Sequence, residues 1–266
     1  MGRRIRRAGG FRGTRGGPAP PRRPRGARAG RRPGRRGLPR GAGTVATVVT
    51  DVGRGPRAEQ VGTTRRQILD TAERLFAERG LYAVSNRQIS TAAGQGNNAA
   101  VGYHFGTKAD LVRTIVRRHT ERIEPLRLEA VAAVEGSVEV RDWVDCLVRP
   151  VTRHLAALGD PTWFARFAAQ VITDPGFRAV MTEEALATPS LRRVLDGLRR
   201  CLPDLPDDVR AERGDMVRDL VVHVCAERER AVADGTVAVR STWDDAATGL
   251  VDAITGLWLA PVSRRP

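Results

Sequence analysis

Residues 85–108 constrain the fold of this chain more than any other part of the sequence. The segment begins with the capping box Ser85-Asn-Arg-Gln88, which predicts a short helix that ends at Gly94. Asn97 or Asn98 is then expected to cap a second short helix. Two short helices joined by a glycine-bearing turn are typical of proteins that place one helix in the major groove of DNA.

Helical periodicity flanks this segment on both sides. Thr64-Arg-Arg-Gln67 forms another capping box, so the preceding helix is expected to begin there and to end at Arg79-Gly80. Thr107 and Asp110 are predicted to cap a longer helix after the segment. The apolar residues expected to face inward recur at helical spacing: Ile68, Leu69, Ala72, Leu75 and Phe76, then Ile89 and Ala92, then Leu111, Val112, Ile115 and Val116.

Charge divides the chain into three parts. Residues 1–57 carry 17 Arg and one acidic residue, residues 58–119 carry 9 basic and 5 acidic residues, and residues 120–266 carry 19 basic and 24 acidic residues. The pI of 11.4 therefore describes the first part. The rest has its positive charge at the helix-turn-helix end, which suits contact with phosphate. We expect a tail over 1–57, a DNA-binding domain over 58–119 and a helical domain over 120–266.

The tail has a composition of its own. Residues 1–44 are almost entirely Arg, Gly, Pro and Ala, which cannot bury enough apolar surface to fold, so disorder is predicted. Three interpretations are open. The tail is a non-specific nucleic-acid tether whose Arg side chains neutralise phosphates, or a solvated leader without a role, or a start-site artefact. The third arises because 44 of the 45 basic residues are Arg, which is typical of a GC-rich gene.

On these residues the sequence resembles the tetracycline-repressor (TetR) family of bacterial transcription regulators. The resemblance is strong over about residues 62–120 and architectural beyond them. It implies an all-α fold, with an N-terminal three-helix helix-turn-helix DNA-binding domain followed by an α-helical ligand-binding and dimerisation domain. It rests on the helix Ile68–Phe76, on Arg79-Gly80, on Ile89–Gly94, and above all on Tyr103-His-Phe-Gly-Thr-Lys108 followed by Leu111.

The resemblance also implies which residues contact DNA. The recognition helix would read base edges, where Arg pairs with guanine, Asn with adenine and an alanine methyl with a thymine methyl. Two departures stand out: Gly102 replaces a second aromatic residue, and the turn over 94–98 is one residue longer than is common. The candidate DNA-binding residues are Ser85, Asn86, Arg87, Asn97, Asn98, Ala99, Ala100, Tyr103, His104 and Lys108, with Arg65 and Arg66 near flanking phosphates.

The second half is helical but less specific. Helices are expected over residues 143–158, from Pro161 to the stop at Asp174-Pro175-Gly176, and over roughly 177–202, followed by two last helices. The resemblance implies an effector pocket here, whose small-molecule ligand and DNA weaken each other's binding. Its candidate lining residues, for which plain core packing is the alternative, are Trp143, His154, Trp163, Phe164 and Phe167.

The last two helices are predicted to form a homodimer interface. In the family such a pair usually makes a four-helix bundle across a dimer axis, and Gly249 and Gly256 would let two backbones approach. A monomer core is the alternative for the same apolar stripes. Two recognition helices one groove-turn apart would read a palindrome. The candidate interface residues are Val217, Leu220, Val224, Leu250, Ile254, Leu257 and Trp258.

These patterns predict a sequence-specific DNA-binding protein, and the resemblance implies a transcriptional regulator, a repressor that a small molecule releases from a palindromic operator in double-stranded DNA. An activator on the same fold and a non-specific nucleic-acid-binding protein driven by the tail are the alternatives. We expect no enzyme activity, cofactor or metal. The sequence shows no nucleophile paired with a general base, no phosphate-binding loop, and no His, Cys or Glu residues at the spacing of metal ligands. No apolar run predicts a membrane span. The expected location is the cytoplasm, at the bacterial nucleoid, with Cys146, Cys201 and Cys225 reduced.

Overall fold

The computed structural model describes residues 56–236 and 242–263, and all regular secondary structure within these ranges is helical. The predicted tail over 1–57 lies outside them apart from the start of the first helix. The helices are α1 (Pro56–Arg79), α2 (Asn86–Ala92), α3 (Ala100–Phe105), α4 (Lys108–Ala133), α5 (Val140–Leu158), α6 (Phe164–Thr173), α7 (Arg178–Leu186), α8 (Pro189–Cys201), α9 (Asp207–Ala233) and α10 (Trp243–Leu259).

The start of α1 differs from the prediction. The helix begins at Pro56 and not at Thr64, which lies in its third turn, so no capping box forms there. Proline suits a first helical position because its φ angle is fixed and its missing N–H would have no partner there. Glu59 adds a negative charge to the first turn, where the helix dipole favours it. The predicted end is confirmed: Gly80 has a φ of 85° and its amide donates to the carbonyl of Phe76.

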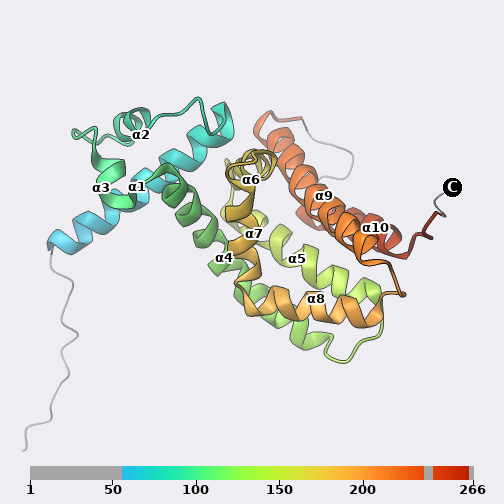
Figure 1. The fold of residues 1–266 in the computed structure, drawn as a ribbon. Coiled ribbons are helices and arrows are strands. Elements are labelled where there is room, and N and C mark those ends of the chain that lie inside the picture. Colours follow the sequence, from blue (N-terminus) through green and yellow to red (C-terminus); the bar gives the residue numbers. More distant parts are fainter. Residues whose placement is uncertain (1–55, 237–241, 264–266) are drawn as a thin grey trace, which may run out of the picture. The chain divides into compact units, whose positions relative to one another are not determined.

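Helix α4 connects the two parts of the fold. Figure 1 shows α1, α2 and α3 grouped around its first turns, while its remaining length runs among α5, α7 and α8. The predicted boundary between residues 119 and 120 therefore falls inside one continuous helix. A displacement of α4 would therefore change the packing both around the helix-turn-helix and among α5, α7 and α8.

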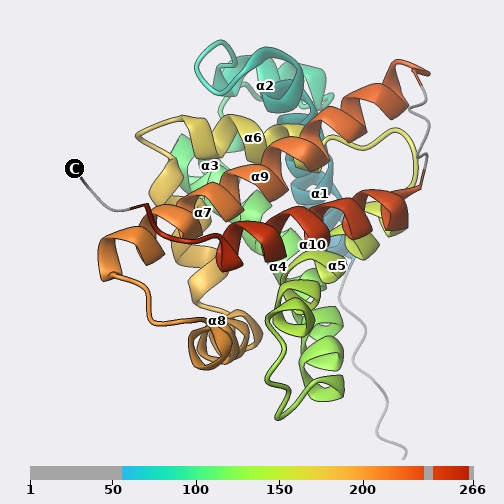
Figure 2. The ribbon, with the colours of Figure 1, turned by 90° about the vertical axis from the view of Figure 1, so that its right-hand side faces the viewer.

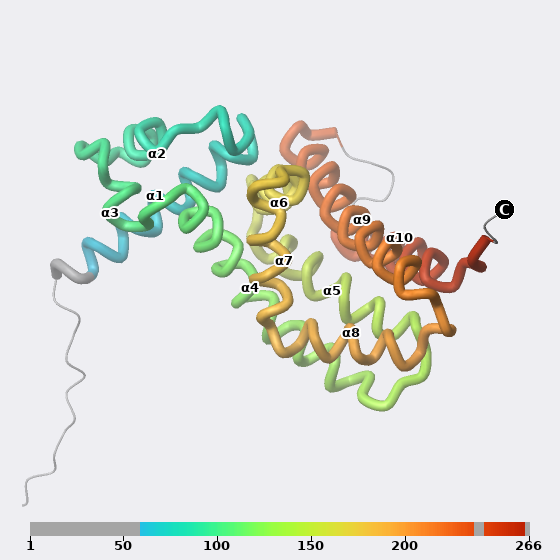
Figure 3. The backbone as a smooth tube through the Cα atoms, viewed as in Figure 1, coloured from blue at the N-terminus to red at the C-terminus, as the bar shows by residue number. Residues whose placement is uncertain are grey.

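The helix predicted over residues 177–202 is wrong as a single element. Two helices occupy this stretch, and Figure 3 shows the chain turning between α7 and α8. The break falls at Ala187 and Thr188 because Pro189 disfavours a helical conformation at the residue before it. Pro189 then serves as a first-turn residue of α8.

The last two helices cover one side of the second part. Figure 2 shows α9 and α10 side by side, with α9 packed on α6 and α10 packed on α5. The buried Glu229 of α9 fixes one of these contacts, because its carboxylate accepts from the amides of Ala165 and Arg166 at 3.2 and 2.9 Å. It thereby caps the start of α6, where no side chain of the N-cap residue does so. None of the described helices is long and apolar enough to cross a membrane.

Candidate nucleic-acid interface and effector cavity

The helix-turn-helix is fixed by caps that the sequence predicted. The amide of Gln88 donates to Oγ of Ser85, and the amide of Ser85 donates back to Oε1 of Gln88 at 2.8 Å. Gly94, with a φ of 69°, follows the end of α2. Thr107 and Asp110 cap α4 in the same reciprocal way. Both helices that flank the short α3 are thus capped at their first turns, whereas α3 has no side-chain cap.

The turn before α3 sets which asparagine faces outward. Oδ1 of Asn97 accepts from the amide of Ala99 at 2.8 Å, so this side chain stabilises the turn itself. The carbonyl of Asn98 accepts from the buried Ser90 hydroxyl. The side-chain amide of Asn98 is exposed and makes no hydrogen bond within the described part of the chain. Of the two, Asn98 is the one whose side chain is available to a ligand.

The structure corrects the predicted role of Ala100. Its side chain is buried, as is that of Val101, because the first turn of α3 packs on the interior of the helix-turn-helix. Neither asparagine is the N-cap of α3, which is Ala99. The outward side of the turn and helix therefore carries Asn98, Ala99 and Tyr103. Tyr103 is 84% exposed, which is unusual for an aromatic residue without a partner surface.

Lys108, predicted as a phosphate contact, is half-buried and makes two hydrogen bonds within the protein. Its Nζ donates to the carbonyls of Leu81 and Val84, each at 2.8 Å, and so braces the connection between α1 and α2. Burial lowers the pKa of this amine. The ammonium lies beside the segment that connects α1 to α2 and donates to two carbonyls of that segment. These charge-assisted hydrogen bonds stabilise the helix-turn-helix.

A second brace, Arg65, was expected only as a flanking phosphate contact. Its guanidinium lies 4.4 Å from the ring centroid of Phe105 and donates to the carbonyl of His104 at 2.8 Å. It thus holds the last turn of α3 to α1. His104 is half-buried beside Tyr103, with ring centroids 5.0 Å apart. The spacing of 39 residues between Arg65 and His104 is why periodicity could not indicate this contact.

The remaining predicted DNA-binding residues lie at the start of α2. Ser85 and Arg87 are exposed, and Asn86 is half-buried with a buried Oδ1 that has no partner among the described residues. Arg87 makes no ion pair or hydrogen bond there either, so its guanidinium is available. Arg87 and the exposed amide of Asn98 thus present hydrogen-bonding groups without a partner in the described chain on neighbouring elements, whereas the hydroxyl of Ser85 is used in the capping box.

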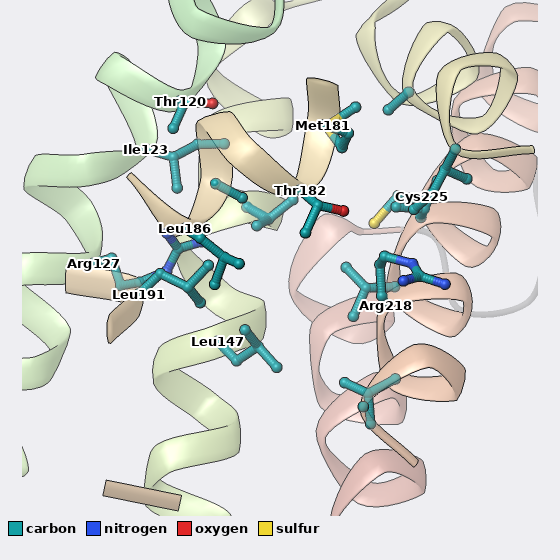
Figure 4. Close-up of a pocket in the computed structure, with 18 of the residues that line it drawn as sticks. Thr120, Ile123, Arg127, Leu147, Met181, Thr182, Leu186, Leu191, Arg218 and Cys225 are labelled. Carbon is teal, nitrogen blue, oxygen red and sulfur yellow. The ribbon is translucent and has the colours of Figure 1, made fainter. Parts of the chain in front are cut away.

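A cavity of about 340 Å³ lies in the second part of the fold, lined by side chains from α4 through α10. Its wall is mostly aliphatic, and Figure 4 shows the aliphatic side chains converging between Arg127 on one side and Arg218 on the other. This size lies within the range of small-molecule pockets, roughly 300–1,000 Å³. The fold therefore contains a space that an apolar small molecule can occupy.

Only one of the five predicted lining residues reaches this cavity. Phe164 lines it. Trp143 packs against Gly197 of α8, and its Nε1 donates to the carbonyl of Ser137 at 3.1 Å. Phe167 is buried against Phe76 of α1, with ring centroids 6.2 Å apart. Trp163 is half-buried at the start of α6, outside the cavity. These three residues are therefore part of the packing between helices, which is the alternative that the sequence left open for them.

His154 belongs to a buried polar cluster at the junction of the two parts. His119 of α4 contacts Nε2 of His154 through its Nδ1 at 2.8 Å and Oε2 of Glu73, on α1, through its Nε2 at 2.9 Å. Arg118 also pairs with Glu73. The ring of Phe164 stacks on His119 with centroids 3.7 Å apart. Phe164 thus contacts both the cavity and the buried His119, which in turn is bonded to Glu73 on α1.

The cluster lowers the pKa values of two of its members, Glu73 and His154. Burial would raise the pKa of Glu73, but hydrogen bonding and charge from His119, with a further contribution from Arg118, lower it overall. Burial and then the charge of His119 lower the pKa of His154 to about 4. His154 is therefore neutral and Glu73 ionised at neutral pH, which is the combination that the hydrogen bonds require.

Four of the predicted dimer-interface residues are buried within the protomer. Val217, Leu250, Ile254 and Trp258 pack in its own core, because α10 lies against α5 and α9 against α6. Leu220, Val224 and Leu257 are half-buried, and Met216 is 45% exposed. No atom lies within 4 Å of a Cβ added at Gly249 or Gly256 among the described residues. Of the predicted interface residues, Leu220, Val224 and Leu257 therefore remain partly accessible in the protomer.

Comparison with known proteins matches both parts of the fold. Residues 68–115 fit the bacterial regulatory proteins of the tetR family, and residues 145–256 fit a tetracyclin repressor-like C-terminal domain. The HTH-type transcriptional repressor Rv1474c of Mycobacterium tuberculosis is 32% identical over 170 residues, covering 60% of this chain and 81% of that protein. The HTH-type transcriptional repressor AcnR of Corynebacterium efficiens is 26% identical over 185 residues, covering 67% and 82%. A tetR-family transcription regulator from Shewanella sp. PV-4 has a crystal structure that matches with a TM-score of 0.48 and 17% identity, covering 73% of this chain and 96% of that one.

A capped helix-turn-helix with an exposed, uncommitted outer side, matched to a regulatory family over the same residues, makes this chain a DNA-binding transcription regulator. Its sequence also aligns with that of a transcriptional repressor over 81% of the relative's length, at 32% identity. The chain belongs to the tetR family of bacterial regulatory proteins.

Proposed function

We propose that this protein is a repressor that binds a palindromic operator as a homodimer and leaves it when a small molecule occupies the cavity. Rv1474c and AcnR, the two relatives described above, are both named as transcriptional repressors, which supports repression over activation. An operator on the bacterial chromosome would place this activity in the cytoplasm.

Exposure and free hydrogen-bonding groups support a set of DNA contacts. Arg87 at the start of α2 would bind phosphate or a base edge, while Asn98, Ala99 and Tyr103 would enter the major groove. Lys108 and Arg65 would hold the helix-turn-helix in shape and would not contact DNA themselves, because each already donates to backbone carbonyls of this unit. Ala100 and Asn97 serve the geometry of the turn.

The observation that carries ligand release is the double role of Phe164. Its ring lines the cavity and also stacks on His119, which is bonded to Glu73 of α1. A ligand that displaces Phe164 would disturb this buried chain and shift α1 relative to α4. Since coupling between two binding sites is reciprocal, the ligand weakens DNA binding by the factor by which DNA weakens ligand binding.

The outer side of α9 and α10 is the proposed dimer contact. Met216 is 45% exposed there, and Leu220 and Leu257, which pack on the protomer core with part of their surface, are still half-accessible. The open space at Gly249 and Gly256 would admit a partner helix. Two-fold pairing through this side would give two recognition helices related by symmetry, as a palindrome requires.

Selection of bound sequences from a random DNA pool tests this function. The full chain and a shorter chain of residues 52–266 are both expected to yield one palindromic motif. No motif from residues 52–266, with tight and salt-sensitive binding by the full chain alone, would instead show that the Arg-rich tail is the nucleic-acid partner.

Release is tested on the selected operator with a panel of small organic molecules. At least one compound is expected to dissociate the complex. Phe164→Ala removes the ring from His119, so it is expected to weaken operator binding without the compound and to reduce the further dissociation that the compound causes. Dissociation that is equal in the two proteins would contradict the role of Phe164. A panel that leaves every complex intact would contradict ligand release.

A further inference from the structure

Arg127 of α4 is a charged side chain in the wall of an apolar cavity. It is 6% exposed, and Figure 4 shows its guanidinium at the side of the cavity opposite Arg218. Arginine is almost never buried to this degree unless it is paired, because taking its charge out of water is costly. The first question is therefore what partner it has.

The described residues give Arg127 no hydrogen bond and no ion pair. Its Nε is buried without a partner. Burial lowers its pKa to about 10, against the opposing charge of Glu124. The guanidinium is thus still protonated at neutral pH. Glu124 does not pair with it, because both carboxylate oxygens accept from Ser190 at the start of α8, one from its amide and one from its hydroxyl.

The other ionisable side chains of the cavity do not offset this charge. Arg218 is already paired with Asp215 and Asp219, at 2.5 and 3.0 Å. Burial raises the pKa of the Cys225 thiol to about 12, so it stays neutral. No carboxylate belongs to the part of the wall that the structure describes. The cavity wall therefore has one positive charge without a hydrogen bond or ion pair among the described residues, that of Arg127, and no carboxylate within the wall faces it.

We propose that the cavity binds an apolar organic acid whose single carboxylate pairs with Arg127 while its hydrocarbon part lies along the aliphatic wall. This inference rests on the proposed function, since it names the class of effector for the same cavity. The planar guanidinium offers two parallel N–H donors that match the two oxygens of a carboxylate. A phosphate monoester fits less well, because its second charge would be buried among aliphatic side chains without a counter-ion.

Calorimetric titration of the full chain without DNA tests the proposal, using decanoate against decan-1-ol and 4-phenylbutyrate against 4-phenylbutan-1-ol. Each pair keeps the hydrocarbon part and changes only the acid group. The acid is expected to bind more tightly than its alcohol by roughly 10- to 100-fold, the value of a hydrogen bond to a charged group. Equal binding within both pairs, or no binding by either acid, would overturn the proposal.

The variant Arg127→Met tests whether Arg127 causes the preference for acid over alcohol. Methionine keeps much of the length and the apolar contacts of the arginine side chain but has no charge. This variant is expected to bind acid and alcohol equally, with alcohol binding as in the parent protein. Arg218→Met is the matched control, since it removes the already paired guanidinium, and it should keep the preference. A preference that survives Arg127→Met would assign it to another group.

Thermal unfolding supplies a readout that needs no ligand. Arg127→Met is expected to raise the Tm, because the fold no longer buries an unpaired charge. A lowered Tm would show that the guanidinium supports the fold and would count against a binding role. The operator assay remains separate: an acid that binds without releasing DNA would contradict ligand release and leave the ligand class intact.

Discussion

Nδ1 of His119 lies 2.8 Å from Nε2 of His154, and both rings are buried where α4 packs on α5. A contact of this length between ring nitrogens needs one shared proton, so the pair cannot be doubly charged without repulsion. Glu73 on α1 accepts from the other side of His119. The junction between the two parts of the protein thus depends on a defined state of protonation.

Acidification is expected to destabilise this protein through His154. Its pKa is about 4 in the fold and 6.5 when unperturbed, so the unfolded chain takes up a proton that the folded chain does not. The free energy of unfolding should therefore fall as pH drops from about 6.5 to about 4, by an amount on the order of 2–3 kcal/mol. Glu73, whose pKa is also lowered, adds a further loss as pH falls below its unfolded value. Urea unfolding measured across this range provides the test.

His154→Gln is the matched variant for the pH experiment. Glutamine can replace the hydrogen bond of Nε2 but does not titrate, so the slope of stability against pH between 6.5 and 4 should become smaller. His223 is exposed on α9 and serves as the control, since His223→Gln should leave the slope unchanged. A slope unaffected by His154→Gln would mean that another group controls acid unfolding.

Gly197→Ala is expected to be strongly destabilising. A Cβ at this position would lie 2.2 Å from Cδ2 of Trp143, whose buried ring is held by the hydrogen bond from its Nε1 to Ser137. Because neither α8 nor the ring can move freely, the cost should reach about 3 kcal/mol, the upper end for overpacked cores. Gly62→Ala in α1, where the added methyl meets nothing within 4 Å, is the control and should not destabilise. Similar Tm values for the two variants would show that α8 moves freely away from the ring.

Gly102→Ala is expected to have the opposite effect in the recognition helix. The position is exposed, helical and open, so alanine gains about 1 kcal/mol of helix propensity without a clash. A more rigid α3 should bind the operator at least as tightly, since less order has to be gained on binding. Chemical unfolding and operator affinity can be measured on the same sample. A lower stability, or a large loss of affinity, would show that the glycine is needed for close approach to DNA.

The helix-turn-helix was predictable because its signals are local. The capping boxes at Ser85 and Thr107 and the stop at Gly80 each depend on residues within one turn, and all three are present. The start of α1 was misplaced because Thr64 fits a capping box, yet the preceding residues continue the helix to Pro56. A cap pattern identifies a possible start but does not exclude an earlier one.

The cavity and the outer side of α9 and α10 were harder to predict, since they depend on how helices pack. Aromatic residues at helical spacing, such as Phe167, serve the core as readily as a pocket. The aliphatic wall contributed by α7 and α8 could not be separated from ordinary core by composition. Leu250 and Ile254 lie on one apolar stripe, but only the packing of α10 on α5 shows that this stripe is internal.

Leu220→Asp is expected to produce monomers. Leu220 of α9 packs on the protomer core with part of its surface and is otherwise accessible, so a carboxylate there would be fully desolvated only when a partner covers it. Light scattering should show half the parent mass, and operator affinity should fall because the two recognition helices are no longer linked. Leu128→Asp is the control, as Leu128 is an exposed residue of α4. A dimer that persists in Leu220→Asp would place the interface elsewhere.

Asn98→Ala and Lys108→Met should separate base reading from support of the fold. The exposed amide of Asn98 has no partner in the described chain, so its loss should relax base preference at one operator position by roughly 1–3 kcal/mol while stability is unchanged. Lys108→Met should leave base preference intact and lower stability by about 1–3 kcal/mol, because the carbonyls of Leu81 and Val84 lose their donor. Binding-site selection and urea unfolding on both variants measure the two effects. A Lys108→Met protein with normal stability and a smaller salt dependence of binding would return this lysine to the phosphate contacts.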